Sequence, residues 1–130
     1  EQVPAKLGPT IPQLATALGD FVPVAKESFS CFANSEFRRR LDATGRREVI
    51  MTGIECHICV YQTALDLLRH GFGVHLVADA VSSRTPENRD IGIRAIKSAG
   101  ARITSTEMVL FELLATAADP QAREIFKIVK

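Results

Sequence analysis

The sequence predicts an α/β fold, in which residues 1–130 form a single domain with a parallel β-sheet covered by helices on both faces, a three-layer α/β/α arrangement. Short apolar runs alternate with longer amphipathic segments, and the connections between them are short, which is typical of a parallel sheet. At 130 residues, with 46% hydrophobic and 24% charged residues, the chain has the size and composition of one globular domain with one core.

Apolar periodicity and turn-forming residues predict the individual elements along the chain. In the first half they predict, after an irregular start, a helix over residues 13–18, a short strand over 21–25 that ends at Lys26, and a helix over 35–41 with Asn34 or Ser35 as its cap. In the second half they predict a buried strand over 49–51, a helix over 56–69, a buried strand over 74–77, a helix over 86–98, a short strand around Ile103, a helix through Leu114 with Thr104 or Ser105 as its cap, and a last helix from Pro120.

Ligands bind such sheets beyond the carboxyl ends of the strands, and this rule makes the turn before the helix over 56–69 the first candidate site. Cys59 falls within the first turn of that helix, where unpaired backbone N–H groups and the positive end of the helix dipole favour a thiolate over a thiol. The same N–H groups can stabilise the oxyanion that forms when a thiolate attacks a carbonyl carbon. A buried structural cysteine is the alternative interpretation of this position.

Lys26 ends the predicted strand over 21–25 and would project at the same edge of the sheet as Cys59. A lysine there can stabilise a thiolate or orient a substrate, and the alternative is a solvated lysine after a strand. The polar run 82–84 leaves the next strand at this edge, where it would either line a pocket or form caps and turns.

Cys56 and Cys59 form a Cys-x-x-Cys pair, which leaves two further interpretations open. In an α/β setting such a pair can be a dithiol redox centre. With His57 or His75 it could begin a zinc site. The residues between the two cysteines are not the turn-forming or aromatic ones typical of redox motifs, and no second cysteine pair exists for a closed structural zinc site. Cys56 is therefore expected to be a small apolar residue in a crowded turn.

Charge and hydropathy argue against several classes of partner. The 16 basic residues are mixed with 15 acidic ones for a net charge of +1, so we expect no nucleic-acid binding. The basic cluster over 38–40, with Arg46 and Arg47, is interpreted as a solvated helix face or, alternatively, as a phosphate-binding patch. No apolar run approaches the roughly 20 residues of a membrane span and no signal peptide is visible, so we expect no membrane partner and a cytoplasmic location.

Residues 49–68, VIMTGIECHICVYQTALDLL, resemble the nucleophile segment of the isochorismatase-like cysteine hydrolases. Three further stretches match the same family, namely EQVPAKLG at 1–8, KESFSCF at 26–32 and VHLVADAVSSR at 74–84. The resemblance implies an aspartate, lysine and cysteine triad in which Cys59 is the nucleophile and Lys26 is the lysine. It also implies a cis peptide bond between Ile54 and Glu55, which would help to aim the backbone N–H groups of Glu55 and Cys59 at the oxyanion.

The aspartate of that triad has no counterpart in this sequence. In the family it ends the first strand, and the family's first strand, first helix and second strand are not found in these 130 residues. The family strand order is 3-2-1-4-5-6, so we expect the strand over 21–25 to lack its neighbours and a gap to open beside the strand over 49–51. Either a longer chain or a second chain is then expected to fill the gap, because an open sheet centre exposes unpaired backbone groups.

The resemblance implies a hydrolase that uses Cys59 on a small amide or a related small-molecule substrate. It implies no cofactor and no metal, and it suggests a homo-oligomer. The alternative is a non-catalytic protein of the same fold that serves as an interaction or oligomerisation module, and the missing aspartate keeps this alternative open.

Overall fold

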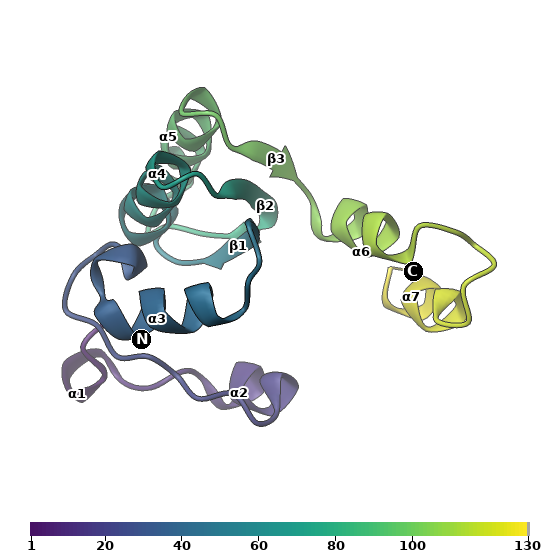
Figure 1. Ribbon diagram of the computed structural model, residues 1–130, viewed down its shortest axis with the longest axis horizontal. Coiled ribbons are helices and arrows are strands. Elements are labelled where there is room, and N and C mark those ends of the chain that lie inside the picture. Colours follow the sequence, from purple (N-terminus) through teal and green to yellow (C-terminus); the bar gives the residue numbers. More distant parts are fainter. Residues whose placement is uncertain (130) are drawn as a thin grey trace.

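The computed structural model describes residues 1–129, which form a three-stranded parallel sheet with helices on both faces (Figure 1). The elements in chain order are α1 (Pro4–Leu7), α2 (Pro12–Leu18), the 3₁₀ turn η1 (Cys31–Ala33), α3 (Ser35–Ala43), β1 (Glu48–Gly53), the π-helical turn η2 (Cys56–Val60), α4 (Tyr61–Arg69), β2 (Gly73–Val81), α5 (Pro86–Ser98), β3 (Arg102–Thr104), α6 (Thr106–Leu114) and α7 (Ala122–Ile128). The strand order is β1-β2-β3, and both pairs are parallel. The predicted α/β class with a parallel sheet is confirmed.

One face of the sheet packs against α4 and α5 and forms the hydrophobic core. Side chains alternate between the two faces along a strand, so Met51, Leu76 and Ile103, which lie opposite one another in neighbouring strands, share this face. Leu76 is fully buried, as are Leu67 of α4 and Ile96 of α5. Full burial of each such side chain contributes about 1.5–3 kcal/mol to the free energy of unfolding.

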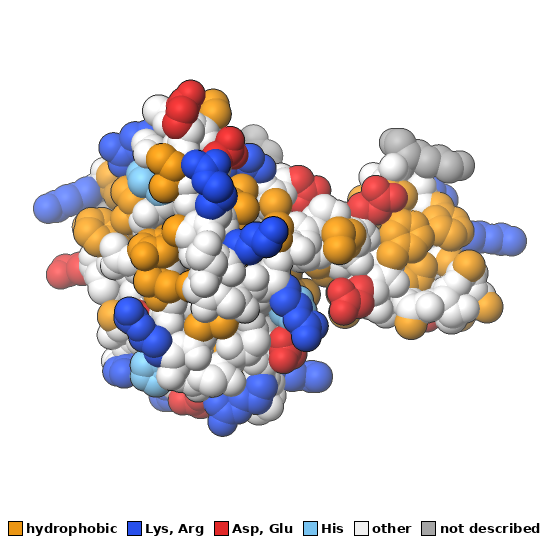
Figure 2. Space-filling model, turned by 90° about the horizontal axis from the view of Figure 1, so that it is seen from above, with side chains coloured by type: hydrophobic (Ala, Val, Ile, Leu, Met, Phe, Trp, Pro, Cys, Tyr) orange, Lys and Arg blue, Asp and Glu red, His pale blue; other side chains and the backbone are white. Residues whose placement is uncertain are grey.

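The opposite face of the sheet carries the alternate residues Ile50, His75 and Arg102. Helix α6 contacts β2 and borders, with these three residues, a groove of about 820 Å³. Helices α6 and α7 then project from the rest of the chain as a separate lobe (Figure 2). Within the lobe the rings of Phe111 and Phe126 lie 5.9 Å apart between centroids. The three-layer order is therefore present, although the second helix layer covers only part of the sheet.

Strand β1 lies at the edge of the sheet and is more exposed than the sequence predicts. A buried strand is expected over 49–51, whereas Met51 alone among the six β1 residues is buried. Ile50 is 49% exposed. Within residues 1–129 no strand pairs with the outer edge of β1, and this agrees with the gap expected there.

The strand predicted over 21–25 does not form, and this expectation is wrong. The segment is extended, but its single bridge joins Lys26 in parallel to Gln2, outside the three-stranded sheet. An extended segment becomes a strand only where a neighbouring strand satisfies its backbone N–H and C=O groups. In residues 1–129 only the N-terminal residues 1–3 run beside it, and they pair with its end, through the carbonyl oxygen of Val24 and the backbone of Lys26.

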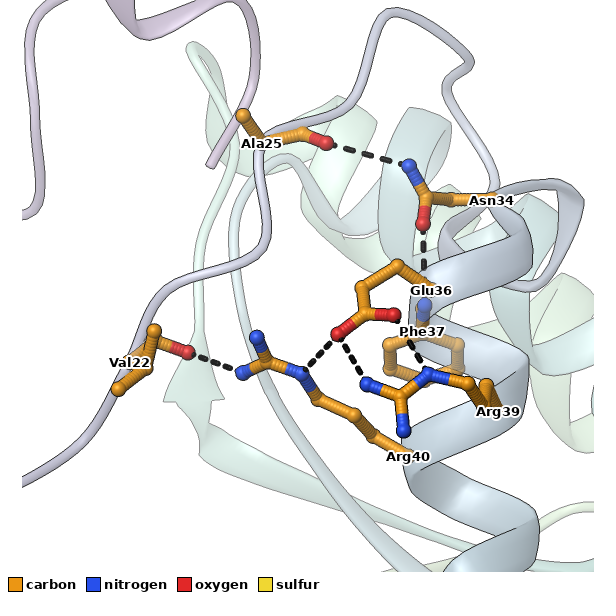
Figure 3. A network of polar contacts seen from close by, with 7 residues as sticks. All are labelled: Val22, Ala25, Asn34, Glu36, Phe37, Arg39 and Arg40. Carbon is orange, nitrogen blue, oxygen red and sulfur yellow. Dashed lines mark hydrogen bonds and ion pairs between the residues drawn. The ribbon is translucent and has the colours of Figure 1, made fainter.

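Side chains of α3 take the place of a neighbouring strand beside this segment (Figure 3). Arg40 Nη1 donates to the carbonyl oxygen of Val22 at 2.7 Å, and Asn34 Nδ2 donates to that of Ala25 at 3.1 Å. Glu36 Oε1 accepts a hydrogen bond from Arg40 Nε at 2.7 Å and so orients the guanidinium. Arg38 and Arg39 are exposed, as expected for a solvated helix face, whereas Arg40 is half-buried because it also bonds to the 21–25 segment.

The remaining elements follow the prediction with small shifts in their ends. Strand β2 extends to Val81, four residues beyond the predicted end at 77. Helix α7 begins at Ala122 and not at Pro120. Asn34 and Ser105 cap α3 and α6 as expected, because each side-chain oxygen accepts the backbone N–H of the residue three positions later.

Replacement of Glu36 by Gln tests the network in Figure 3. Hydrogen bonds from Arg39 and Arg40 lower the pKa of Glu36 from its usual 4.5 to about 2. A pKa that is lower in the folded than in the unfolded state means that the carboxylate stabilises the fold above pH 4.5, and that this contribution is lost as the pH falls to about 2. Glu36→Gln should therefore lower the free energy of unfolding at pH 7, with the two proteins converging toward pH 2.

Urea unfolding followed by circular dichroism between pH 2 and pH 7 measures this difference. Added salt should reduce it at pH 7, since the network is exposed to solvent. A difference that is independent of both pH and salt would contradict the assignment to the carboxylate.

Candidate functional site

The turn that carries Cys59 is wider than an α-helical turn. In η2 the backbone N–H of Val60 donates to the carbonyl oxygen of Glu55, five residues earlier, at 3.2 Å. The sequence predicts an ordinary helix from Cys56 onward, so the prediction is right about the helix and wrong about its first turn. π-Helical turns are rare in proteins as a whole, but those that occur are often found at functional sites. Cys59 is half-buried within this turn.

The peptide bond between Ile54 and Glu55 is cis, as the resemblance implies. Ile54 is 72% exposed, whereas Glu55 is half-buried. The Glu55 carboxylate accepts hydrogen bonds from Arg84 Nε at 3.0 and 3.1 Å. Three predicted site residues, Ile54, Glu55 and Cys59, therefore lie on one continuous turn that follows β1.

The end of β2 holds this turn in position. Ser82 donates its backbone N–H to the carbonyl oxygen of Gly53 at 3.2 Å and accepts the N–H of Cys56 at 2.8 Å. Next to it, Ser83 Oγ lies 3.0 Å from His57 Nδ1. The sequence leaves open whether the polar run after β2 lines a site or only forms a turn. In the structure this run contacts the turn that carries Cys59.

Arg89 of α5 satisfies carbonyl groups at the irregular end of β2. Its Nε donates to the carbonyl oxygen of Val81 at 3.1 Å, and its Nη2 donates to that of Ala78. A strand carbonyl without a ladder partner needs another donor when it is partly buried. Arg89 therefore supports the part of β2 that in turn supports the Cys59 turn.

Helix α5 approaches the same turn closely at Gly92. A Cβ atom at this position would lie 2.9 Å from the carbonyl carbon of Cys56 and from the nitrogen of His57. Cys56 is fully buried, and this burial raises the pKa of its thiol. The expectation that Cys56 is a small apolar residue in a crowded turn is confirmed.

Lys26 lies on a different segment from Cys59. Its ammonium donates to Gln2 Oε1 at 2.5 Å and to the carbonyl oxygens of Ser28 at 2.9 Å and Phe29 at 2.8 Å. These bonds use all three ammonium hydrogens. No hydrogen bond joins Lys26 to Cys59 in residues 1–129. Gln2 is a site residue that the sequence does not predict, because nothing local to it reveals a lysine 24 positions away.

The loop that follows the lysine is attached to α4 next to Cys59. Thr63 Oγ1 donates to the carbonyl oxygen of Cys59 at 2.6 Å and accepts the backbone N–H of Cys31 at 2.9 Å. Ser30 Oγ donates to Asp66 Oδ2 at 2.7 Å. Thr63 and Ser30 are both buried. The two predicted catalytic residues are thus connected through this loop.

The described residues offer little for a metal ion. Across residues 1–129, no three His, Cys, Asp or Glu side chains lie close enough together to hold one. All three cysteines are free thiols. A hollow of about 580 Å³ lies beside Lys26, and Cys59 is not among its lining residues. Within the same part of the chain, each helix is too short or too polar to cross a bilayer.

Comparison with known families decides the relationship. Residues 4–108 match the model of the isochorismatase domain. The chain belongs to the isochorismatase family. It is 40% identical over 134 residues to the secreted isochorismatase effector Isc1 of Phytophthora sojae, covering 99% of this chain and 63% of that protein. It is 38% identical over 131 residues to isochorismatase domain-containing protein 2 of Bos taurus, covering 100% of this chain and 62% of that protein. The chain thus spans less than two thirds of these relatives.

Solved structures agree with this family assignment. The MAR1 ribonuclease of Caenorhabditis elegans superposes with a TM-score of 0.90 at 36% identity, covering 99% of this isochorismatase-family chain and 66% of the worm protein. YcaC of Pseudomonas aeruginosa, solved with hexane-2,5-diol and covalent acrylamide, superposes with a TM-score of 0.79 at 28% identity, covering 85% of this chain and 55% of YcaC. The resemblance seen in the sequence is confirmed at the level of family and fold.

Gly92→Ala tests the contact between α5 and the Cys59 turn. Helix propensity alone would make alanine about 1 kcal/mol more stable than glycine within a helix. The contact of the new methyl group with the Cys56 and His57 backbone should cost about 1–3 kcal/mol and outweigh that gain. Urea unfolding should therefore show a less stable variant, whereas Arg94→Ala, at an exposed position of the same helix, should change stability little. A Gly92→Ala protein more stable than the parent would contradict the close contact.

Proposed function

We propose that this chain carries the nucleophile of a cysteine hydrolase that acts on a small amide or a related small molecule. Cys59 is the nucleophile and Lys26 is the cationic residue of the site. The observation that carries the proposal is the turn after β1, in which a cis peptide bond, a π-helical turn and a half-buried cysteine follow one another in a member of the isochorismatase family.

The proposed reaction begins with attack by the Cys59 thiolate on the carbonyl carbon of the substrate. A carbon–sulfur bond forms, and the carbonyl electron pair moves onto the oxygen. Collapse of this intermediate expels the amine, which takes up a proton, and leaves a thioester. Water then adds to the thioester, releases the acid and restores the thiol. We assign no residue of these 130 to the proton acceptor, because the family aspartate has no counterpart here.

The oxyanion is assigned to the backbone N–H groups of Glu55 and Cys59. Hydrogen bonds within the turn support this choice, since the N–H of Cys56 is donated to Ser82, and that of Val60 to the Glu55 carbonyl. Preorganised donors at the position where negative charge develops give a large part of the catalysis in such reactions.

Lys26 contributes positive charge at a fixed position. Its three acceptors are neutral oxygens, so within residues 1–129 no carboxylate in hydrogen-bond contact neutralises the ammonium. The charge is then free to stabilise a thiolate or an anionic intermediate nearby. YcaC of Pseudomonas aeruginosa holds covalent acrylamide, an electrophile that nucleophiles attack at its vinyl carbon, so that structure supports a reactive nucleophile in the fold and not a particular substrate class.

RNA is a weaker substrate candidate, although the worm relative bears the name ribonuclease. Nucleic-acid binding depends on clustered positive charge, and here 16 basic residues are mixed with 15 acidic ones. Arg39 and Arg40 of the basic cluster are paired with Glu36. The absence of nucleic-acid binding stays a prediction, as does the cytoplasmic location.

The second candidate function is a non-catalytic interaction or oligomerisation module. The unpaired edge of β1 favours it, since Ile50 and Ile54 are 49% and 72% exposed there. An open edge strand with apolar neighbours is a ready site for another strand. Homo-oligomer formation is therefore proposed together with either function.

Alkylation kinetics separate the two candidates. Iodoacetamide at pH 7 should modify Cys59 about tenfold faster than Cys56, because Cys56 is fully buried with a raised pKa while Cys59 is only half-buried. Peptide mapping by mass spectrometry gives the rate at each cysteine. Cys59→Ser should abolish the fast reaction and Lys26→Met should slow it. If Cys59 reacts no faster than cysteine in a short unstructured peptide, the module is favoured.

A further inference from the structure

We propose that Thr63 is a positioning residue of this site, whose buried hydroxyl fixes the loop that carries the lysine against the turn that carries Cys59. The inference rests on the proposed function of Cys59 and Lys26 and adds a residue that determines their relative position. Thr63 is 3% exposed and lies on α4, one helical turn after Cys59. Its side chain is therefore buried on the helix that follows directly after the turn carrying Cys59.

The two hydrogen bonds of the Thr63 hydroxyl have different significance. A threonine hydroxyl often bonds to the carbonyl four residues earlier in a helix, so the 2.6 Å bond to Cys59 is ordinary by itself. The bond from the Cys31 N–H, at 2.9 Å, comes from a residue 32 positions earlier in the chain. The Thr63 hydroxyl can make both bonds because it is at once a donor and an acceptor, which the isosteric side chain of valine is not. The side chain therefore joins two segments that no backbone pairing connects.

The connection continues to the lysine along a short path. The Lys26 ammonium is bonded to the carbonyl oxygens of Ser28 and Phe29, which lie three and two residues before Cys31. Movement of this loop relative to α4 would move the ammonium relative to the Cys59 sulfur. The Thr63 hydroxyl thus connects the loop directly to Cys59, since it bonds to the backbone of Cys31 and to the backbone of Cys59.

Ser30 provides a matched control on the same loop. Its hydroxyl also bonds to α4, through Asp66 Oδ2 at 2.7 Å, but it does not contact Cys59. Loss of this bond removes one attachment of the loop to α4. The two hydrogen bonds of the Thr63 hydroxyl, to Cys31 and to Cys59, stay intact. Comparison of Ser30→Ala with Thr63 variants therefore separates general loosening of the loop from loss of the specific connection.

The experiment compares two alkylating reagents on Cys59 at pH 7, the anion iodoacetate and the neutral iodoacetamide. Positive charge near the sulfur favours the anion, so the ratio of the two rate constants reports the position of the lysine whatever fraction of the thiol is ionised. Lys26→Met should lower the ratio about two- to fivefold. Thr63→Val, which keeps the shape and removes the hydroxyl, should lower it toward the Lys26→Met value. Thr63→Ser and Ser30→Ala should keep the parent ratio.

Each outcome has a defined meaning. If Cys59 in the parent protein is no more reactive than an unstructured cysteine, the proposed function fails. If the parent is reactive and Lys26→Met lowers the ratio while Thr63→Val does not, the positioning role is wrong and the proposed function stands. If Thr63→Val does not fold, hydrogen exchange of the Cys31 amide in the parent protein decides. Protection comparable to the α4 amides supports the inference, and exchange at the rate of an open loop overturns it.

Discussion

The pairing of β2 with the chain that leaves β1 sets the geometry on which the site depends. The two strands are in register as far as Met51, which lies opposite Leu76, but Gly53 then lies opposite Val81. Two steps along β1 thus correspond to five along β2, so the extra length of β2 brings the backbone of Ser82 to the start of the Cys59 turn. Both polar groups of that backbone bond to the turn. Support from β2 thus pairs the backbone N–H of Cys56 at the start of the wide turn.

Local patterns in the sequence predict those elements whose surroundings are supplied by the same chain. The helix over 86–98 and the short strand around Ile103 are found where apolar spacing and capping residues place them. The segment 21–25 has the composition of a strand and fails to become one, because a strand also needs a partner. The run 49–51 does pair, but only on one side, so it is a strand at the predicted place with an exposure that the sequence alone does not reveal.

The site residues divide in the same way. Cys59 could be predicted as a candidate because its position between a strand and a helix is a local property of the sequence. The resemblance adds Lys26 and the cis bond before Glu55. Gln2 and Thr63 could not be predicted as residues of the candidate site. Each is connected to it by a hydrogen bond to a residue more than 20 positions away in the sequence. A threonine on a largely buried helix gives no local signal that its hydroxyl connects two segments. Only the fold shows that this hydroxyl accepts a hydrogen bond from the Cys31 N–H.

The π-helical turn also explains why two cysteines three residues apart have different environments. In an α-helix, residues at i and i+3 lie on neighbouring parts of one face, about 60° apart around the axis. A π turn has more residues per turn, so each residue advances less and the two directions diverge further. Cys56 is accordingly enclosed beneath Gly92 with no exposed surface, while Cys59 is only half-buried. This divergence opposes a disulfide between them and leaves Cys59 as the more accessible thiol of the pair, which agrees with the proposed hydrolase better than with a dithiol redox centre.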